Sequence, residues 1–196
     1  MATEIDTEIH QLSRQIESLK QQLSEARRRR PVEPVQDFPL HNPDGSPTTL
    51  SALFGDRDDL IVVHNMGRGC VYCTLWADGF NSLVPHLENR AAFVVVSPDA
   101  PEVQTNFAAS RGWTFQMASA AGSDFTSALG YEHEGGYMPG VSAFRRQPDG
   151  SIVRTGRDNF GPGDDYSAPW RLFDLLGGGV GEWEPRYRYL NEAEPS

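Results

Sequence analysis

The sequence is poor in cysteine, in positive charge and in long apolar runs. It has two cysteines in 196 residues, and 27 acidic against 17 basic residues give a formal net charge of −10. This acidity argues against nucleic acid or an anionic membrane as the main partner. No segment approaches the roughly 18 apolar residues of a membrane span, and the N-terminus lacks the basic and apolar regions of a signal peptide. We therefore expect a cytoplasmic protein with no membrane partner.

The first unit, residues 1–30, carries an apolar repeat that predicts an amphipathic helix. β-Branched side chains at heptad position a, with leucine at d, favour a parallel two-stranded coiled coil, so we expect a homodimer through this helix. The alternative is a single amphipathic helix that lies on its own domain or on that of a neighbouring molecule. Residues 27–30 are all arginine and complement the dipole at the helix end, and Pro31 and Pro34 begin a linker. The apolar positions are Ile5, Ile9, Leu12, Ile16, Leu19 and Leu23.

The second unit, residues 35–179, alternates strand-like and helix-like segments. Continuous apolar runs are typical of buried parallel strands, and a Pro-Asp-Gly turn at 148–150 predicts a hairpin. This order predicts an α/β fold with a mixed central sheet and helices on both faces, preceded by the N-terminal helix. We expect strands at 38–46, 60–65, 91–97, 113–118 (an edge strand), 141–146 and 151–155, and helices at 50–54, 74–80, 101–109, 124–129 and 167–176.

The last helix and the chain end complete the predicted organisation. Ser167 is a suitable N-cap for the helix at 167–176, and three glycines at 177–179 end it. Residues 180–196 are acidic, and we expect them to form a loosely packed tail.

The two cysteines are spaced Cys-Val-Tyr-Cys, as Cys70 and Cys73, after a strand-like run and a short Gly-rich turn. A helix-like segment follows, which places the first thiol at or near a helix N-terminus. Unpaired N–H groups and the helix dipole favour a thiolate at that position. A Cys-x-x-Cys beside a βαβ pattern, in a chain with no other cysteine, is typical of a thioredoxin-like redox motif. Two thiols at this spacing can alternatively help to hold one metal.

Short runs along nearly the whole chain carry a family resemblance: 59–66, 70–73 with 76–80, 85–87, 95–98, 111–115, 139–144 and 161–166. Together with the Arg-rich helical N-terminus, they resemble an uncharacterised bacterial thioredoxin-like family that is catalogued as a domain of unknown function. The resemblance implies a thioredoxin-like fold elaborated at its N-terminus as in peroxiredoxins. It implies little about the reaction, because a fold does not fix a function.

The motif predicts a thiol–disulfide oxidoreductase that acts on a disulfide or thiol of a protein or small molecule and needs no cofactor. Cys70 is the candidate nucleophile, and its pKa would be lowered by the helix N-terminus and by Arg68 if that side chain points inward. Cys73, one turn into the helix, is the candidate resolving thiol. Asp78, one turn further on, is either a proton acceptor or an ordinary surface carboxylate. The alternative is that both thiols are an inactive relic on this scaffold.

The resemblance to thioredoxin-like proteins adds a second element to the site. In those proteins a cis proline precedes a strand, and the backbone of the residue before it lies against the Cys-x-x-Cys. Met138 and Pro139 occupy that place here, directly before the strand predicted at 141–146. The resemblance therefore implies that they shape the active site.

The motif also departs from the well-known relatives. Thioredoxins usually have Trp before the first cysteine and Gly-Pro between the pair, whereas this chain has Gly69 and then Val-Tyr. Peroxiredoxins place Thr or Ser three residues before the reactive cysteine, after an earlier Pro. This chain has Gly67 there and no Pro between His64 and Cys70. A standard peroxidase site is therefore not supported.

Histidines supply an alternative function. Cys70 and Cys73 with His133 form a possible zinc or copper site. His64, within a strand, is more typical of a hydrogen-bonded core residue than of a ligand. A third hypothesis, based on the apolar repeat of residues 5–23, is a non-catalytic dimeric protein.

Overall fold

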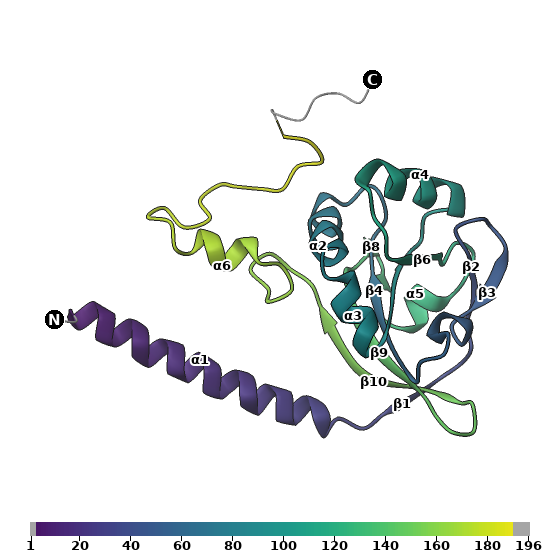
Figure 1. Cartoon of the computed structure of the whole chain (residues 1–196), viewed down its shortest axis with the longest axis horizontal. Coiled ribbons are helices and arrows are strands. Elements are labelled where there is room, and N and C mark those ends of the chain that lie inside the picture. The colour runs from purple at the N-terminus through teal and green to yellow at the C-terminus, as the bar shows by residue number, and fades with distance from the viewer. Residues whose placement is uncertain (1–2, 190–196) are drawn as a thin grey trace.

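A computed structural model describes residues 3–189 and shows an eight-stranded mixed sheet with helices on both faces (Figure 1). The strand order is β1-β10-β9-β4-β5-β6-β2-β3, in which β4, β5 and β6 run parallel and the other neighbours are antiparallel. The predicted α/β architecture is confirmed. The strands are β1 Glu33–Val35, β2 Pro39–His41, β3 Pro47–Thr49, β4 Asp59–His64, β5 Ala92–Ser97, β6 Gln116–Ser119, β9 Gly140–Arg146 and β10 Ile152–Asn159.

The helices and one small hairpin complete the structure. A 3-10 turn, η1 Ala52–Phe54, confirms the helical turn predicted at 50–54. The hairpin β7 Glu132–His133 and β8 Gly136–Tyr137 forms a separate two-stranded sheet. The α-helices are α1 Glu4–Arg28, α2 Val71–Asn81, α3 Val84–Arg90, α4 Pro101–Arg111, α5 Phe125–Ala128 and α6 Pro169–Phe173.

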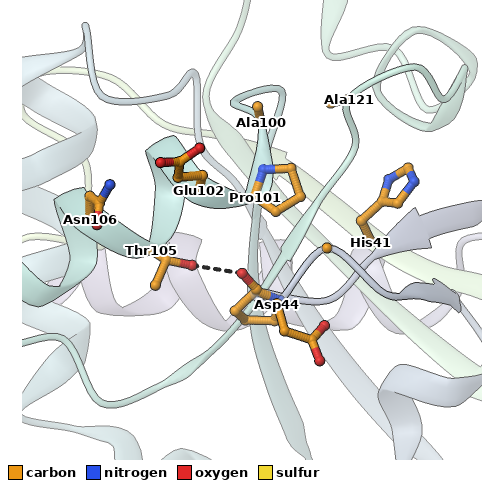
Figure 2. Close-up of a pocket in the computed structure, with 10 residues that line it drawn as sticks. His41, Asp44, Ala100, Pro101, Glu102, Thr105, Asn106 and Ala121 are labelled. Atoms are coloured by element: carbon orange, nitrogen blue, oxygen red, sulfur yellow. Dashed lines mark hydrogen bonds between the residues drawn. The ribbon is translucent and has the colours of Figure 1, made fainter.

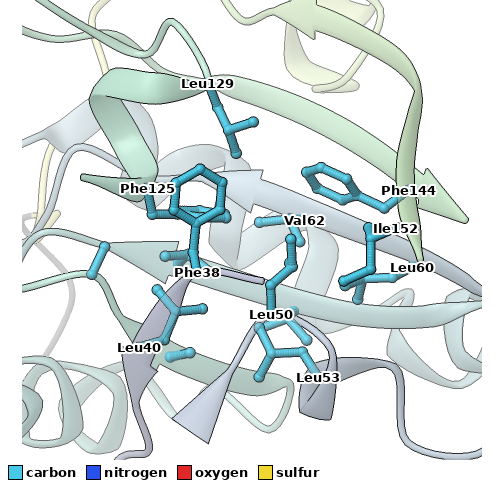
Figure 3. Close-up of a cluster of buried hydrophobic side chains, with 14 of the residues drawn as sticks. Phe38, Leu40, Leu50, Leu53, Leu60, Val62, Phe125, Leu129, Phe144 and Ile152 are labelled. Atoms are coloured by element: carbon cyan, nitrogen blue, oxygen red, sulfur yellow. The ribbon is translucent and has the colours of Figure 1, made fainter. Parts of the chain in front are cut away.

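Successive side chains of a strand point to opposite faces of the sheet. The central strands therefore contribute to a hydrophobic core on each face. Leu60 and Val62 belong to a cluster with residues of η1 and α5, shown in Figure 3. Val63, on the opposite face, packs with Trp76 and Phe80 of α2. These two cores hold β4 and α2 in place, and the cysteines lie in the connection between them.

Two predictions about the sheet and its connections need correction. Residues 116–119 form an interior strand, not an edge strand, because β2 pairs with β6 through His41 and Ser119. The linker after α1 is not free, because Glu33–Val35 forms the edge strand β1 against β10. Pro34 is tolerated there because an edge strand has one unpaired side. The sheet therefore begins two residues before the predicted domain boundary at 35.

The last helix is shorter than predicted, covering Pro169–Phe173 only. Ser167 is buried and does not cap it; the N-cap is Ala168, which makes no side-chain capping bond. In the tail that follows, the Trp183 ring lies 4.8 Å from Phe173 and 5.6 Å from Trp170, whereas most residues of 181–189 are exposed, as expected for a loosely packed segment. The rest of the predicted tail, 190–196, lies outside the described residues.

Helix α1 is confirmed, and it begins with a capping box between Thr3 and Asp6. None of its residues is buried, and it extends away from the sheet in Figure 1. The alternative in which the apolar face of the helix lies on its own domain is therefore wrong. Within residues 3–189 no helix combines the length and apolar character needed to cross a membrane.

Candidate functional site

Cys70 lies at the start of α2, as the sequence predicted. It is the N-cap residue, with extended backbone angles, and its Sγ accepts a hydrogen bond from the N–H of Cys73 at 3.0 Å. A sulfur therefore takes the place of the Ser, Thr, Asp or Asn oxygen that usually satisfies an unpaired N–H at a helix N-terminus. Both cysteines are free thiols in this structure.

The turn between β4 and Cys70 is held by side chains at the carboxyl end of the sheet. Asn65 Oδ1 accepts the N–H of Gly67 at 2.8 Å, and Asp99 accepts the N–H of Arg68 at 2.7 Å. Gly67 has a φ of +97°, and a Cβ there would lie 2.8 Å from the Asp99 carboxylate. Only glycine fits this position without displacing the carboxylate.

Asp99 is a site residue that the sequence analysis missed. It follows β5, which runs parallel to β4, so the segments after the two strands meet at one edge of the sheet. Functional side chains in open α/β sheets gather at that edge. The position of Asp99 directly after a buried strand was the signal that could have identified it.

The two thiols have pKa values shifted in opposite directions. A hydrogen bond with Cys73 is the largest cause that lowers the pKa of Cys70 to about 7, and the backbone N–H groups of Cys73 and Tyr72 add to it against the effect of burial. The pKa of Cys73 is raised, first by its hydrogen bond with Cys70 and then by burial and repulsion from that charge. Cys73 is only 3% exposed. Near pH 7 about half of the molecules therefore carry a negative charge on the pair, and that charge is on Cys70.

Alkylation of Cys70 is expected to follow this pKa. Below pH 7 the thiol is mostly protonated, so the rate with iodoacetamide should rise nearly tenfold per pH unit and level off above pH 8. Site-resolved mass spectrometry measures the rate at Cys70. A midpoint near the ordinary thiol value of 9.0 would contradict the assigned hydrogen bonds. In a Cys73→Ala variant we expect the midpoint to move upward, because the largest cause of the shift is removed.

Arg68 and Asp78 make contacts that do not involve the thiols. Arg68 contributes its main chain to the turn, and its guanidinium is not among the groups that lower the pKa of Cys70. Asp78 pairs with Arg111 and accepts the Nε1–H of Trp113 at 2.8 Å. Its carboxylate therefore joins α2 to the end of α4, which agrees with the interpretation of a surface carboxylate.

Pro139 lies at the same end of the sheet as the cysteine turn, because its neighbour Gly140 pairs with His64 at the end of β4. The expected cis bond is wrong: no peptide within residues 3–189 is cis. The N–H of Met138 donates to the Tyr131 carbonyl at 2.8 Å, and the Pro139 carbonyl accepts from Phe160 at 3.0 Å. These bonds on both sides of the Met138–Pro139 peptide lead the chain directly into β9 with a trans bond.

Within residues 3–189, the structure places neither His64 nor His133 in a cluster of metal-ligating side chains. His64 is buried, its Nε2 lies 3.0 Å from Ser142 Oγ, and its ring stacks on Tyr131 at 3.7 Å, so the core interpretation is confirmed. His133 is exposed on the β7–β8 hairpin. Nowhere in the described part of the chain do three His, Cys, Asp or Glu residues gather in a way that could hold a metal. The structure therefore does not assemble the predicted set of Cys70, Cys73 and His133.

The C-terminal segment reaches the site, which no sequence signal indicated. Tyr187 donates its hydroxyl to the carbonyl of Arg68 at 2.9 Å, and Arg111 donates to the Tyr187 carbonyl at 2.7 Å. Burial raises the pKa of Tyr187, and negative charge on the cysteine pair raises it further. Tyr187 thus fixes the tail beside the cysteine turn.

Removing the Tyr187 hydroxyl is expected to expose Cys70 more often. One hydrogen bond contributes about 0.5–1.5 kcal/mol, so Tyr187→Phe should speed alkylation of Cys70 about 2- to 10-fold. The matched control is Tyr189→Phe, because the Tyr189 hydroxyl accepts the N–H of Arg186, a neighbour within the tail. Equal rates in the wild-type chain and both variants would show that the tail does not limit access.

A separate hollow of about 630 Å³ lies between the β2–β3 turn and the start of α4. Figure 2 shows the hydrogen bond of 2.9 Å from Thr105 Oγ1 to the Pro43 carbonyl, which joins its two sides. His41 and Glu102 are among its lining residues, but neither cysteine is. It is therefore not part of the thiol site.

Solved structures similar to this chain include several peroxiredoxin-type proteins. The peroxidoxin BcpB from Mycobacterium tuberculosis is 25% identical, with 65% of this chain and 84% of that chain covered and a TM-score of 0.51. A peroxiredoxin-like protein from Aquifex aeolicus is 15% identical, with 65% and 74% covered and a TM-score of 0.52. A cysteine-to-serine variant of PrxQ from Xylella fastidiosa is 20% identical, with 67% and 87% covered and a TM-score of 0.51. The thioredoxin-like fold predicted from the sequence is thereby confirmed.

No curated protein matches the chain. The family that the sequence resembled is confirmed by a match over nearly the full length. A family model described as a bacterial protein of unknown function (DUF899) matches residues 7–194, and the chain belongs to that family.

Proposed function

We propose that this protein is a thiol–disulfide oxidoreductase that uses Cys70 as nucleophile and Cys73 as resolving thiol. The observation that carries the proposal is the asymmetry of the pair. Cys70 is half-buried at a helix N-terminus with its pKa lowered to about 7, whereas Cys73 is buried with its pKa raised. The peroxidoxin and peroxiredoxin names of the similar structures support a redox role in the broader sense.

The first step forms a mixed disulfide. The Cys70 thiolate attacks one sulfur of a substrate disulfide, the substrate S–S bond breaks, and the departing thiolate takes a proton from water. The negative charge on Cys70 disappears in this step. Two causes that raise the pKa of Cys73, its hydrogen bond with the Cys70 thiolate and repulsion from it, therefore weaken, and only burial remains.

The second step releases the reduced substrate. Cys73 loses its proton to solvent and attacks the Cys70 sulfur, which displaces the second substrate thiolate. The Cys70–Cys73 pair has then lost two electrons and the substrate has gained two, so exchange itself requires no cofactor. In the reverse direction the oxidised pair donates a disulfide. The expected cytoplasmic location would keep the pair mostly reduced and favour reduction of the substrate.

Met138 and Pro139 are proposed to shape the approach of the substrate. They lie at the end of the sheet that carries the cysteine turn, and the Met138 side chain is 38% exposed. The substrate in this proposal is a disulfide of a protein or small molecule.

Trapping of the mixed disulfide tests the proposal. A Cys73→Ser chain mixed with a labelled disulfide peptide should accumulate a peptide adduct on Cys70, because nothing resolves it. The wild-type chain should release the peptide and keep an internal disulfide. Absence of the adduct in Cys73→Ser would contradict the proposal. If hydrogen peroxide oxidises Cys70 much faster than the peptide does, peroxide reduction replaces disulfide exchange as the function.

A further inference from the structure

The apolar stripe of α1 is left uncovered by the rest of residues 3–189. It consists of Ile5, Ile9, Leu12, Ile16, Leu19 and Leu23. Its six Ile and Leu side chains are each 49–62% exposed, and no residue of the helix is buried. At 1.5 Å per residue the 25-residue helix is about 37 Å long. An exposed apolar stripe of this length marks an interaction surface.

The stripe borders the side of α1 that faces the domain. Lys20 pairs with Asp165 at 2.9 Å and Arg27 pairs with Asp158, so these two side chains lie on the side of the helix toward the domain. Ile16 precedes Lys20 by four residues, as Leu23 precedes Arg27, and side chains four apart are neighbours on one helix face. The stripe therefore lies beside the side of α1 that pairs with its own domain.

Arg27 also lines an apolar groove of about 300 Å³ between the helices α2 and α3 and the strands β4, β9 and β10. Phe80 of α2 and Leu87 of α3 line its helical side. Its apolar lining includes Ile61, Val63, Phe80, Phe93, Val141 and Phe160. The stripe and the groove thus meet near the C-terminal end of α1.

Charge along α1 selects the orientation of a partner helix. Glu4, Asp6 and Glu8 lie at its N-terminal end, whereas residues 27–30 are all arginine. A parallel pair would place like charges together at both ends, and an antiparallel pair places opposite charges together. Antiparallel helix dipoles add to this preference. The intervals between the six apolar residues, 4, 3, 4, 3 and 4, are the same when counted from either end of the helix. In an antiparallel pair each apolar residue can therefore lie opposite another apolar residue.

We propose that α1 forms an antiparallel pair with α1 of a second copy of this chain. Ile5 then lies opposite Leu23, Ile9 opposite Leu19, and Leu12 opposite Ile16. The N-terminal end of the second copy reaches the groove beside Arg27. This orientation replaces the parallel one that the a and d residues favoured, because the end charges oppose a parallel pair. The proposal is independent of the chemistry at Cys70.

The mass in solution tests the association. The wild-type chain should have twice its monomer mass of 21.7 kDa by light scattering. Leu12→Glu with Ile16→Glu should give a monomer, because charges at the centre of the pair repel. The matched control, Ser18→Glu with Gln21→Glu, adds the same charge to the opposite face and should remain a dimer. Circular dichroism checks that the helix persists. A monomeric wild-type chain would overturn the proposal.

Disulfide crosslinking tests the orientation in a Cys70→Ser, Cys73→Ser background. Chains with Ile5→Cys mixed with chains with Leu23→Cys should form a mixed disulfide between the two positions. Ile5→Cys alone should not crosslink, because the two copies of position 5 are about 27 Å apart in the antiparallel pair. Efficient crosslinking of Ile5→Cys with itself would overturn the antiparallel arrangement.

Discussion

Replacing Cys70 by serine is expected to slow reduction of a disulfide substrate by roughly a thousandfold or more, as loss of a covalent nucleophile does in other enzymes. A serine hydroxyl stays protonated at neutral pH and does not attack sulfur. The serine oxygen can still accept the N–H of Cys73, so α2 should keep its N-cap and its fold. Rapid quenching followed by mass spectrometry measures the rate in a single turnover.

The Cys73→Ser variant separates the two thiols. It should keep the first attack within about tenfold of the wild-type rate, because the serine hydroxyl can still donate a hydrogen bond to the Cys70 thiolate and the full value of a bond to a charged group, roughly 1.5–3 kcal/mol, is not lost. It should fail only at release of the substrate. If Cys70→Ser retains the wild-type rate, or if the two variants are equally impaired in the first step, the assigned roles are wrong.

Acid is expected to destabilise the fold through His64. Burial is the main cause that lowers the pKa of His64 to about 3 from its ordinary 6.5, and the charge of Arg154 lowers it further. The unfolded chain therefore binds a proton at pH values where the folded chain does not. Stability is fully present above pH 6.5 and falls by up to about 1.4 kcal/mol per pH unit as the pH decreases toward 3.

A matched pair of variants separates the contribution of His64 to the pH dependence of stability from that of the carboxylates. His64→Gln can still bond Ser142, and it should flatten the pH dependence of the unfolding free energy between pH 6.5 and 4.5. His86→Gln, on the exposed surface of α3, should leave the slope unchanged. Denaturant unfolding at several pH values gives the slopes. Identical slopes in His64→Gln and the wild-type chain would show that the buried ring does not cause the acid sensitivity.

The sequence predicted the parts of the site that depend on local structure. An apolar strand, a Gly-rich turn and a helix-like segment were enough to place Cys70 at a helix N-terminus. Asp99 could also have been found, because the segments after parallel strands meet at one edge of the sheet. Successive side chains of a strand point to opposite faces of the sheet. The placement of Leu60 and Ile61 in different cores therefore also follows from the sequence.

Contacts between distant segments account for what the sequence did not predict. Pairing of β2 with β6 makes residues 116–119 an interior strand, and pairing of β1 with β10 orders the linker around Pro34. Backbone bonds to Tyr131 and Phe160 fix the trans path through Pro139. Tyr187 reaches Arg68 across 119 residues of sequence. None of these pairings leaves a periodic or compositional signal in its own segment.

The reduction potential of the Cys70–Cys73 pair tests the central claim most directly. Thiol trapping in glutathione buffers measures the fraction of disulfide at equilibrium. We predict a value within the roughly −120 to −270 mV range of known exchange proteins, and its place in that range indicates the direction of exchange. If no disulfide forms, or if one forms that glutathione does not reduce, the pair is not an exchange site and the account is contradicted.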